Sequence, residues 1–254
     1  MGVITDYPIV LLLVSLACMW LAERLGVMLA RRHGPAESDV RDAFNVVQGA
    51  TLTLLALIIG FSFSMSISRY DQRKLYEEAE ANAIGTEYVR LDLLPPAEAS
   101  KARALLVDYL AQRIAFYSTR SDAGLRNINA RTSKLQAQLW AAVVPPAQEK
   151  PDVLSALVVA GMNDVLNSQG YAQASWWNRI PAAAWALMVV IALGCNLLIG
   201  FSSRRLTTEP ALLFILPVVI AISFMLIADI DSPKGGLIRV APQNLIALAD
   251  SLKH

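Results

Sequence analysis

The chain has 254 residues, of which 55% are hydrophobic and only 17% are charged, and its formal net charge is +1. With a mean hydropathy of +0.45, this composition is too apolar for an ordinary soluble domain and indicates a multi-pass membrane protein. The near-zero net charge also excludes a dominant electrostatic surface for nucleic acid.

Four segments are long and apolar enough to cross a bilayer, which takes about 20 residues of helix. They cover roughly residues 7–30, 50–68, 180–201 and 210–228. Glu23 and Arg24 interrupt the last third of the first span and are interpreted as residues near the membrane surface, with a place in a pathway as the alternative. Cys18 and Cys195 lie inside spans, where each behaves as a small hydrophobic side chain.

The second span continues into charged sequence without a helix-breaking residue. Residues 50–68 carry no charge, and residues 69–80 contain neither Pro nor Gly. The sequence therefore predicts one helix that crosses the membrane and extends into water.

One face of this second helix changes from apolar to hydroxyl-bearing to acidic along its length. At 100° per residue, the members of this stripe fall within an arc of about 100°; they are Thr53, Leu57, Gly60, Phe61, Ser64, Ser68 and Asp71. Such a gradient is typical of a pore wall with a hydrophobic constriction and a polar mouth. Close packing against another helix is the alternative, and Ser62 with Ser66 forms a second small-residue pair on the opposite face.

The charges at and beyond the end of the stripe leave the preferred ion open. Asp71 and Glu78 favour cations at the mouth, whereas Arg69 and Arg73 lie close by in the sequence.

Residues 69–178 have the composition and periodicity of a helical bundle inserted between the second and third spans. We expect breaks at Pro95-Pro96 and at Pro145-Pro146, and a loop over residues 121–129. The carboxylates of the bundle are interpreted as a solvated surface. The cluster of Trp176, Trp177 and Arg179 predicts an anchor in the lipid headgroup zone.

The predicted organisation is therefore an all-α membrane protein with four parts. Residues 1–68 hold the first two spans, 69–178 the bundle, 179–229 the last two spans, and 230–254 a C-terminal tail. The basic residues beside the spans give opposing orientations, so the sequence leaves open which side of the membrane the bundle faces.

Several stretches resemble the bacterial bestrophin-like family and, more distantly, bestrophin channels. They are residues 60–73, residues 80–86 with Leu93-Leu94-Pro95, and residues 228–236. The resemblance implies a homo-oligomer, a pentamer, assembled around the second span in a bacterial plasma membrane. Bestrophins narrow their pore with three bulky apolar residues one turn apart, at positions that correspond to Thr53, Leu57 and Phe61. Thr53 departs from that pattern.

Bestrophins also carry an acidic calcium-binding cluster, partly after the last span. The resemblance makes Asp229 and Asp231 calcium candidates, although two carboxylates are few for an ion that takes six to eight oxygen ligands. No other metal and no cofactor is expected.

Two functions follow from these patterns. The first is an oligomeric ion channel lined by the second helix, with the bilayer and inorganic ions as its partners. The second is a membrane-anchored helical scaffold or sensor without conductance. An enzyme is not expected, because no nucleophile motif, phosphate loop or metal-ligand spacing is present in the sequence.

Overall fold

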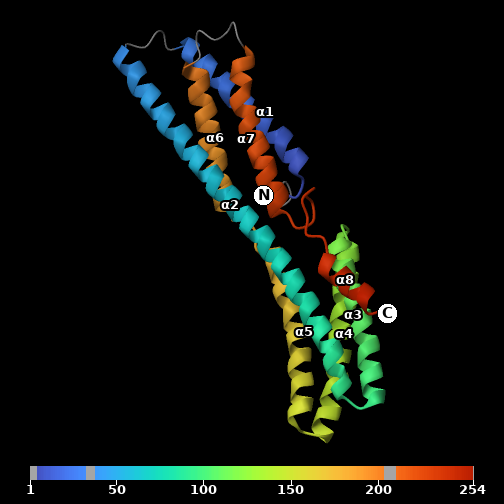
Figure 1. Ribbon diagram of the computed structural model, residues 1–254. Helices are drawn as coiled ribbons and strands as arrows, with labels where there is room; N and C mark the ends of the chain where they lie inside the picture. Colours follow the sequence, from blue (N-terminus) through green and yellow to red (C-terminus); the bar gives the residue numbers. More distant parts are fainter. Residues whose placement is uncertain (1–4, 33–37, 203–209, 254) are drawn as a thin grey trace. The chain divides into compact units, whose positions relative to one another are not determined.

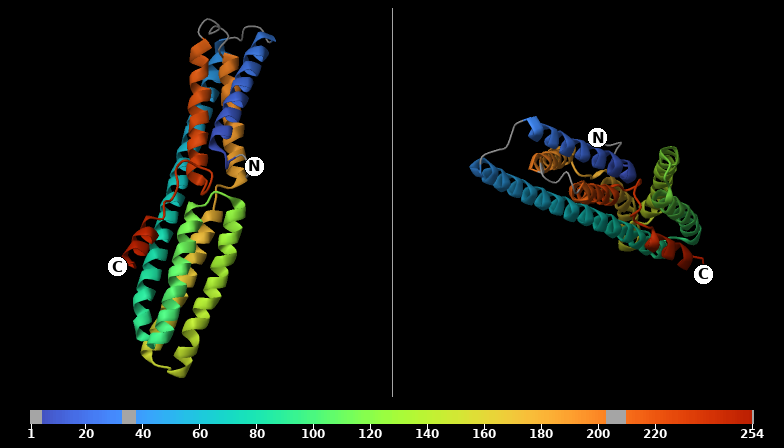
Figure 2. Two further views of the ribbon diagram at one scale, coloured as in Figure 1. Left: turned by 90° about the vertical axis from the view of Figure 1, so that its right-hand side faces the viewer. Right: turned by 90° about the horizontal axis from the view of Figure 1, so that it is seen from above.

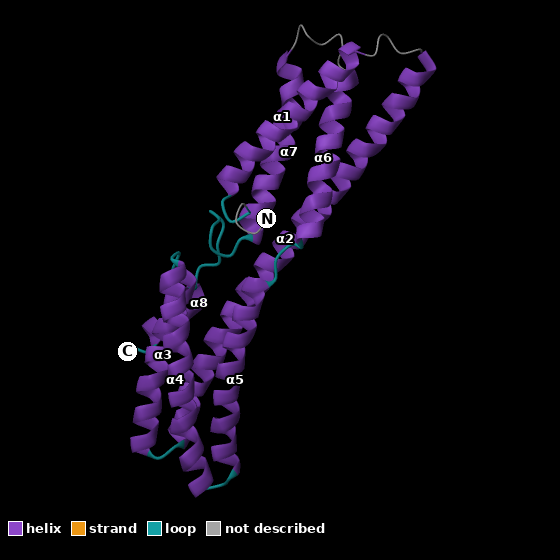
Figure 3. Ribbon diagram, turned by 180° about the vertical axis from the view of Figure 1, so that it is seen from behind, coloured by secondary structure: helices purple, strands orange, loops and turns teal. Residues whose placement is uncertain are grey.

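The computed structural model describes residues 5–32, 38–202 and 210–253, and within these ranges every regular element is a helix (Figures 1 and 3). The elements are α1 (Pro8–Arg32), α2 (Ser38–Arg90), the 3-10 helix η1 (Leu91–Leu93), α3 (Pro96–Ser118), α4 (Asp122–Glu149), α5 (Val153–Trp177), α6 (Ala182–Ser202), α7 (Pro210–Asp231) and α8 (Gln243–Ser251). Among the described residues, four helices are long and apolar enough to cross a membrane. The predicted all-α fold with four spans is confirmed.

The chain divides into two compact units. The first, here the membrane unit, comprises Met1–Ser68 and Arg179–Ile238. The second, here the bundle unit, comprises Arg69–Asn178 and Arg239–His254. The helix α2 contributes to both, and its 53 residues run without interruption, which confirms the prediction of a single helix beyond residue 68.

The membrane unit packs α1 against α6 and α7 (Figure 2). Its core consists of aliphatic and aromatic side chains, among them Met19 of α1, Met188 of α6 and Phe224 of α7. The rings of Trp185 and Phe224 meet edge to face with their centroids 6.0 Å apart, a favourable geometry for an aromatic pair.

Two glycines bring α1 and α6 into backbone contact. A Cβ atom at Gly26 would collide with the carbonyl oxygen of Leu197, and one at Gly200 would collide with the carbonyl oxygen of Glu23. Small residues of this kind let membrane helices approach closely and gain van der Waals contact. This contact matters in lipid, because the hydrophobic effect does not drive helices together there.

The bundle unit is built from α3, α4, α5, α8 and the second part of α2 (Figure 1). Leu106 and Leu110 of α3, Leu139 of α4 and Val158 and Met162 of α5 are almost completely buried in its core. Side chains cap two of its helices: Ser121 accepts a hydrogen bond from the N–H of Gly124, and Asp152 forms a reciprocal capping box with Ser155.

The two proline pairs behave differently. Pro96 is the first residue of α3, where a missing N–H costs nothing, so the predicted break at Pro95-Pro96 is confirmed. The break at Pro145-Pro146 is wrong, because both prolines lie inside α4. They occupy its final turns and their fixed φ is helical, so the helix loses only two hydrogen bonds and ends at Glu149.

The predicted loop over residues 121–129 is also too long. The connection between α3 and α4 is Thr119–Ser121, and the turn-forming residues Gly124, Asn127 and Asn129 lie within α4. The Ser121 cap starts the helix before these residues. At the end of the chain, residues 239–254 belong to the bundle unit and include α8, a helix that the sequence did not predict.

Candidate pore-lining face and polar networks

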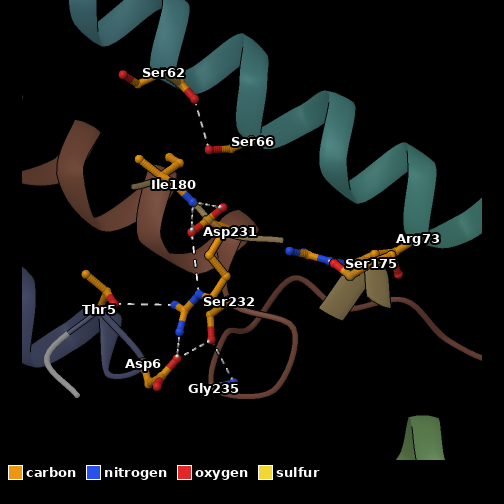
Figure 4. A network of polar contacts seen from close by, with 11 residues as sticks. Thr5, Asp6, Ser62, Ser66, Arg73, Ser175, Ile180, Asp231, Ser232 and Gly235 are labelled. Carbon is orange, nitrogen blue, oxygen red and sulfur yellow. Dashed lines mark hydrogen bonds and ion pairs between the residues drawn. The ribbon is translucent and has the colours of Figure 1, made fainter. Parts of the chain in front are cut away.

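The α2 stripe is exposed in the subunit along its whole length. Its seven members, from Thr53 to Asp71, are all exposed, with 53% of Leu57 and 65% of Phe61 accessible. Ser62 and Ser66 are buried on the opposite face, and the Ser66 hydroxyl donates to the Ser62 carbonyl oxygen over 2.9 Å (Figure 4). The two serine faces are therefore separate, and the one with Phe61 is exposed in the single subunit, with only Gly60 at the edge of the groove beside α7.

Thr53 is less polar in this setting than its residue type suggests. Its hydroxyl donates to the carbonyl oxygen of Gly49 one turn earlier, at 2.9 Å. With the hydroxyl turned toward the backbone, the side chain offers mainly its methyl group to the stripe. The departure from a fully apolar constriction at this position is therefore small.

The charged residues at the end of the stripe point in different directions. Asp71 and Glu78 are exposed, whereas only 2% of Arg73 is accessible. The Arg73 guanidinium donates to the Ser175 carbonyl oxygen of α5 over 3.4 Å, inside the bundle unit. Arg73 therefore does not stand beside Asp71 on the exposed stripe.

A groove lies beside the stripe within the membrane unit. It has a volume of about 460 Å³ and lies between α2 and α7, lined mostly by aliphatic side chains. Phe63 lines this groove, whereas Phe61, two residues earlier, does not. The two phenylalanines thus occupy different faces of α2.

A polar junction ties together the chain segments at one end of the membrane unit (Figure 4). The guanidinium of Arg179 pairs with Asp6 at 2.6 Å and with Asp231 at 3.6 Å. The backbone N–H of Ile180 donates to both carboxylate oxygens of Asp231, each at 3.2 Å. Ser232 donates to Asp6 over 3.2 Å. The junction therefore links the segment before α1, the segment before α6 and the end of α7.

The bundle unit contains a second polar network, around buried glutamates of α2. Glu80 pairs with the guanidinium of Arg113 and accepts a hydrogen bond from the Tyr117 hydroxyl at 3.3 Å. Glu77 accepts from the Asn244 amide at 2.6 Å and from the Leu245 N–H of α8 at 3.0 Å. Burial raises the pKa of Glu80, an effect that the charge of Arg113 opposes.

These glutamates contradict the interpretation of the bundle carboxylates as a solvated surface. Glu77, Glu80 and Glu87 are all buried. Their spacing of three and seven residues was a usable signal, because it places them on the same helical face as Ile84 and Leu91.

The comparison with known protein families decides where the chain belongs. Residues 9–245 match the model of the bestrophin-like domain, which is almost the whole chain. The chain belongs to the bestrophin-like family. No curated protein matches the sequence.

Solved structures with the same fold include bacterial bestrophins. A bacterial bestrophin homologue from Klebsiella pneumoniae aligns with a TM-score of 0.64 at 15% identity, over 95% of this chain and 98% of the other. A point variant of that homologue aligns with a TM-score of 0.65 at 15% identity, over 95% of each chain. A structure described as a membrane protein variant aligns with a TM-score of 0.65 at 15% identity, over 95% of this chain and 98% of the other. At this identity the likeness establishes the fold.

The calcium site that the bestrophin resemblance implied does not fit the carboxylates present. Asp229 accepts the N–H groups of Leu237 and Ile238 at 2.7 and 2.9 Å. Asp231 is held by Ile180 and Arg179, as described above. Both carboxylates therefore serve donors of the chain itself, and among the described residues no group of His, Cys, Asp and Glu side chains could hold a metal ion.

The predicted headgroup anchors have different environments in this bestrophin-like chain. Trp176 packs in the core of the bundle unit, with its ring 4.2 Å from that of Phe116. Arg179 is engaged in the polar junction of the membrane unit. Trp177 is 74% exposed, so the headgroup role stays a prediction for this residue.

Proposed function

We propose that this bestrophin-like chain is a subunit of an oligomeric ion channel whose pore is lined by the α2 stripe. The observation that carries the proposal is that all seven stripe residues are exposed, whereas the opposite face of α2 holds the buried side chains of Leu55, Ser62 and Ser66. A ring of copies that turns the stripe toward its axis gives the stripe a continuous aqueous surface. The family resemblance favours five copies and a bacterial plasma membrane.

The chemistry of the stripe divides the proposed pore into two parts. Leu57 and Phe61 lie one turn apart and form an apolar constriction, with the methyl group of Thr53 one turn earlier. Ser64 and Ser68 supply hydroxyl groups, and Asp71 ends the stripe with a carboxylate. Cations are the ions favoured at this mouth, because Asp71 is exposed, whereas Arg69 is half-buried and Arg73 is bonded inside the bundle unit.

The test is the conductance of the purified protein in lipid bilayers. Phe61→Ala removes a bulky ring from the constriction, and we expect single-channel conductance to rise by about twofold or more and the cation to anion permeability ratio to change little. The matched control is Phe63→Ala, which removes the same ring from the same helix but on the face toward α7. We expect wild-type conductance from this control.

Two results would contradict the channel. Equal effects of both substitutions would mean that the stripe does not line the conduction path. A protein that passes no ions in any bilayer would leave the membrane-anchored scaffold as the remaining function.

A further inference from the structure

One buried carboxyl group of the bundle unit has no partner. Glu77 and Glu80 each accept hydrogen bonds, as described above. Glu87 lies on the same face of α2 and none of its surface is exposed, yet neither of its carboxyl oxygens has a hydrogen-bond partner within the described part of the chain. A buried group of this kind calls for a specific explanation.

The carboxyl group of Glu87 faces a glycine of α5. The space that a Cβ atom at Gly161 would occupy is filled by Oε2 of Glu87 and by the guanidinium of Arg90. Gly161 itself is buried. The absence of a side chain at this position is therefore what admits the carboxyl group between α2 and α5.

Few charges act on Glu87. Arg90 lies one turn further along α2, and Asp164 is contributed by α5 and is exposed. Asp92 of η1 and Arg103 of α3 form an ion pair with each other. Glu87 thus lies between one positive and one negative group and makes no hydrogen bond with either.

This environment favours the neutral acid. An ionised carboxylate loses its hydration on burial and recovers that loss only from hydrogen-bond donors, and the described residues offer Glu87 none. Burial raises the pKa of Glu87 to about 8, with Arg90 opposing the shift and Asp164 adding to it. The ordinary value for a glutamate is 4.5.

We infer that Glu87 is a proton-binding site of the bundle unit, which holds the neutral acid between α2 and α5 near neutral pH and releases the proton in mildly alkaline solution. On release, the carboxylate must either leave its place over Gly161 or pair with Arg90, which shares that space. Proton release therefore alters the contact between α2 and α5. The inference concerns the bundle unit alone and does not depend on ion conduction.

The sign of the effect on stability follows from proton linkage. Between pH 4.5 and about 8 the native state keeps the proton on Glu87 while the unfolded chain loses it, so stability falls as the pH rises through this window. The melting temperature of the full-length protein in detergent is measured from about pH 5 to about pH 9, for the wild type and for Glu87→Gln. The amide imitates the neutral acid, and we expect Glu87→Gln to gain about 5 °C or more over the wild type at the alkaline end.

Two further variants change the charges near Glu87 and leave Glu87 itself in place. The quantity that they shift is the difference in melting temperature between the protein with the Glu87→Gln substitution and the one without it, plotted against pH as a difference curve. Asp164→Asn removes a negative charge and should shift the midpoint of the difference curve to lower pH. Arg90→Gln removes a positive charge and should shift it to higher pH. Each variant is compared with a double variant that also carries Glu87→Gln. The difference between the two removes the effects of the charge change on groups other than Glu87.

The infrared band of a protonated carboxyl group supplies an independent readout on the wild type. We expect part of this band to persist at pH 7, to be absent in Glu87→Gln and to disappear from the wild type near pH 8. Parallel melting curves for the wild type and Glu87→Gln, with no such band at pH 7, would overturn the inference.

Discussion

Arg113 neutralises the buried carboxylate of Glu80 in the core of the bundle unit. Arg113 is fully buried, its Nε pairs with Glu80 and its guanidinium lies 4.4 Å from the centre of the Phe116 ring. Breaking a buried ion pair on one side leaves an uncompensated charge, which costs more than the pair itself contributes. Loss of Arg113 should therefore destabilise the folded bundle unit, because the Glu80 charge would remain buried without a partner.

We predict that Arg113→Met lowers the free energy of unfolding by about 3–5 kcal/mol at about pH 8. The loss is smaller at about pH 5, because burial raises the pKa of Glu80 and removal of Arg113 raises it further, so that Glu80 becomes neutral in acid. Denaturation of the full-length protein in detergent at both values of pH measures this difference.

The double variant Glu80→Gln/Arg113→Met removes both charges and should recover most of the loss at about pH 8. Arg126→Met, at an exposed position of α4, is the control for removal of an arginine and should change stability by less than about 0.5 kcal/mol. A loss that is the same at both values of pH would contradict the role assigned to the Glu80 charge.

The same residues show what the sequence could and could not predict about the site. The members of the α2 stripe follow from helical periodicity, and the structure finds all of them exposed. Spacing alone places Glu80 on the same face of α2 as Ile84 and Leu91, but what makes burial of its charge possible is an arginine that spacing does not reveal. Its partner Arg113 is 33 residues away, and no local pattern joins the two.

At the scale of the elements, backbone contact between α1 and α6 places the strictest limit on sequence. Gly26 and Gly200 each face a carbonyl oxygen of the opposite helix, so even one methyl group must push the helices apart. Helices packed by small residues lose contact over several turns when they separate.

We therefore predict that Gly200→Ala destabilises the protein in detergent by about 1–3 kcal/mol, through overpacking. Gly194→Ala is the matched control on the same helix, because a Cβ atom there meets nothing within 4 Å. The control should keep or slightly raise stability, since alanine is the better helix former. Equal melting temperatures for the two variants would show that α1 and α6 do not approach as closely as described.

The elements also show where sequence reasoning reaches its limit. Hydropathy over some 20 residues located all four spans, because only a helix satisfies its backbone in lipid. Local signals were less decisive in the bundle, where Pro96 starts a helix but Pro145 and Pro146 continue one. The outcome depends on where a proline falls relative to the helix ends, and packing with other helices decides that.

At the scale of the whole molecule, the exposed stripe has its proposed meaning only in an assembly. The sequence shows an apolar-to-acidic gradient, but whether that face meets water, lipid or another copy depends on contacts that lie outside one chain. The match to bacterial bestrophins at 15% identity establishes the fold of the subunit and leaves the number of copies to experiment.

The number of copies is measured by native mass spectrometry from detergent or nanodiscs. We predict a single species at five times the subunit mass of 27.6 kDa, in line with the resemblance to bestrophins. A closed cyclic homo-oligomer has a fixed number of copies, so a single mass is expected. A stable monomer or dimer would exclude a pore shared between subunits.

Mixed assemblies then distinguish a shared pore from one pore per subunit. If the Phe61 rings of all copies surround one axis, coexpression of the wild type with Phe61→Ala should produce single-channel conductances at several levels between those of the two pure proteins. Each added alanine widens the same constriction by one side chain, so the levels should follow the number of variant subunits. If each subunit conducted alone, only the two parental levels would occur. Coexpression with Phe63→Ala should give the wild-type level alone, since that ring lies toward α7.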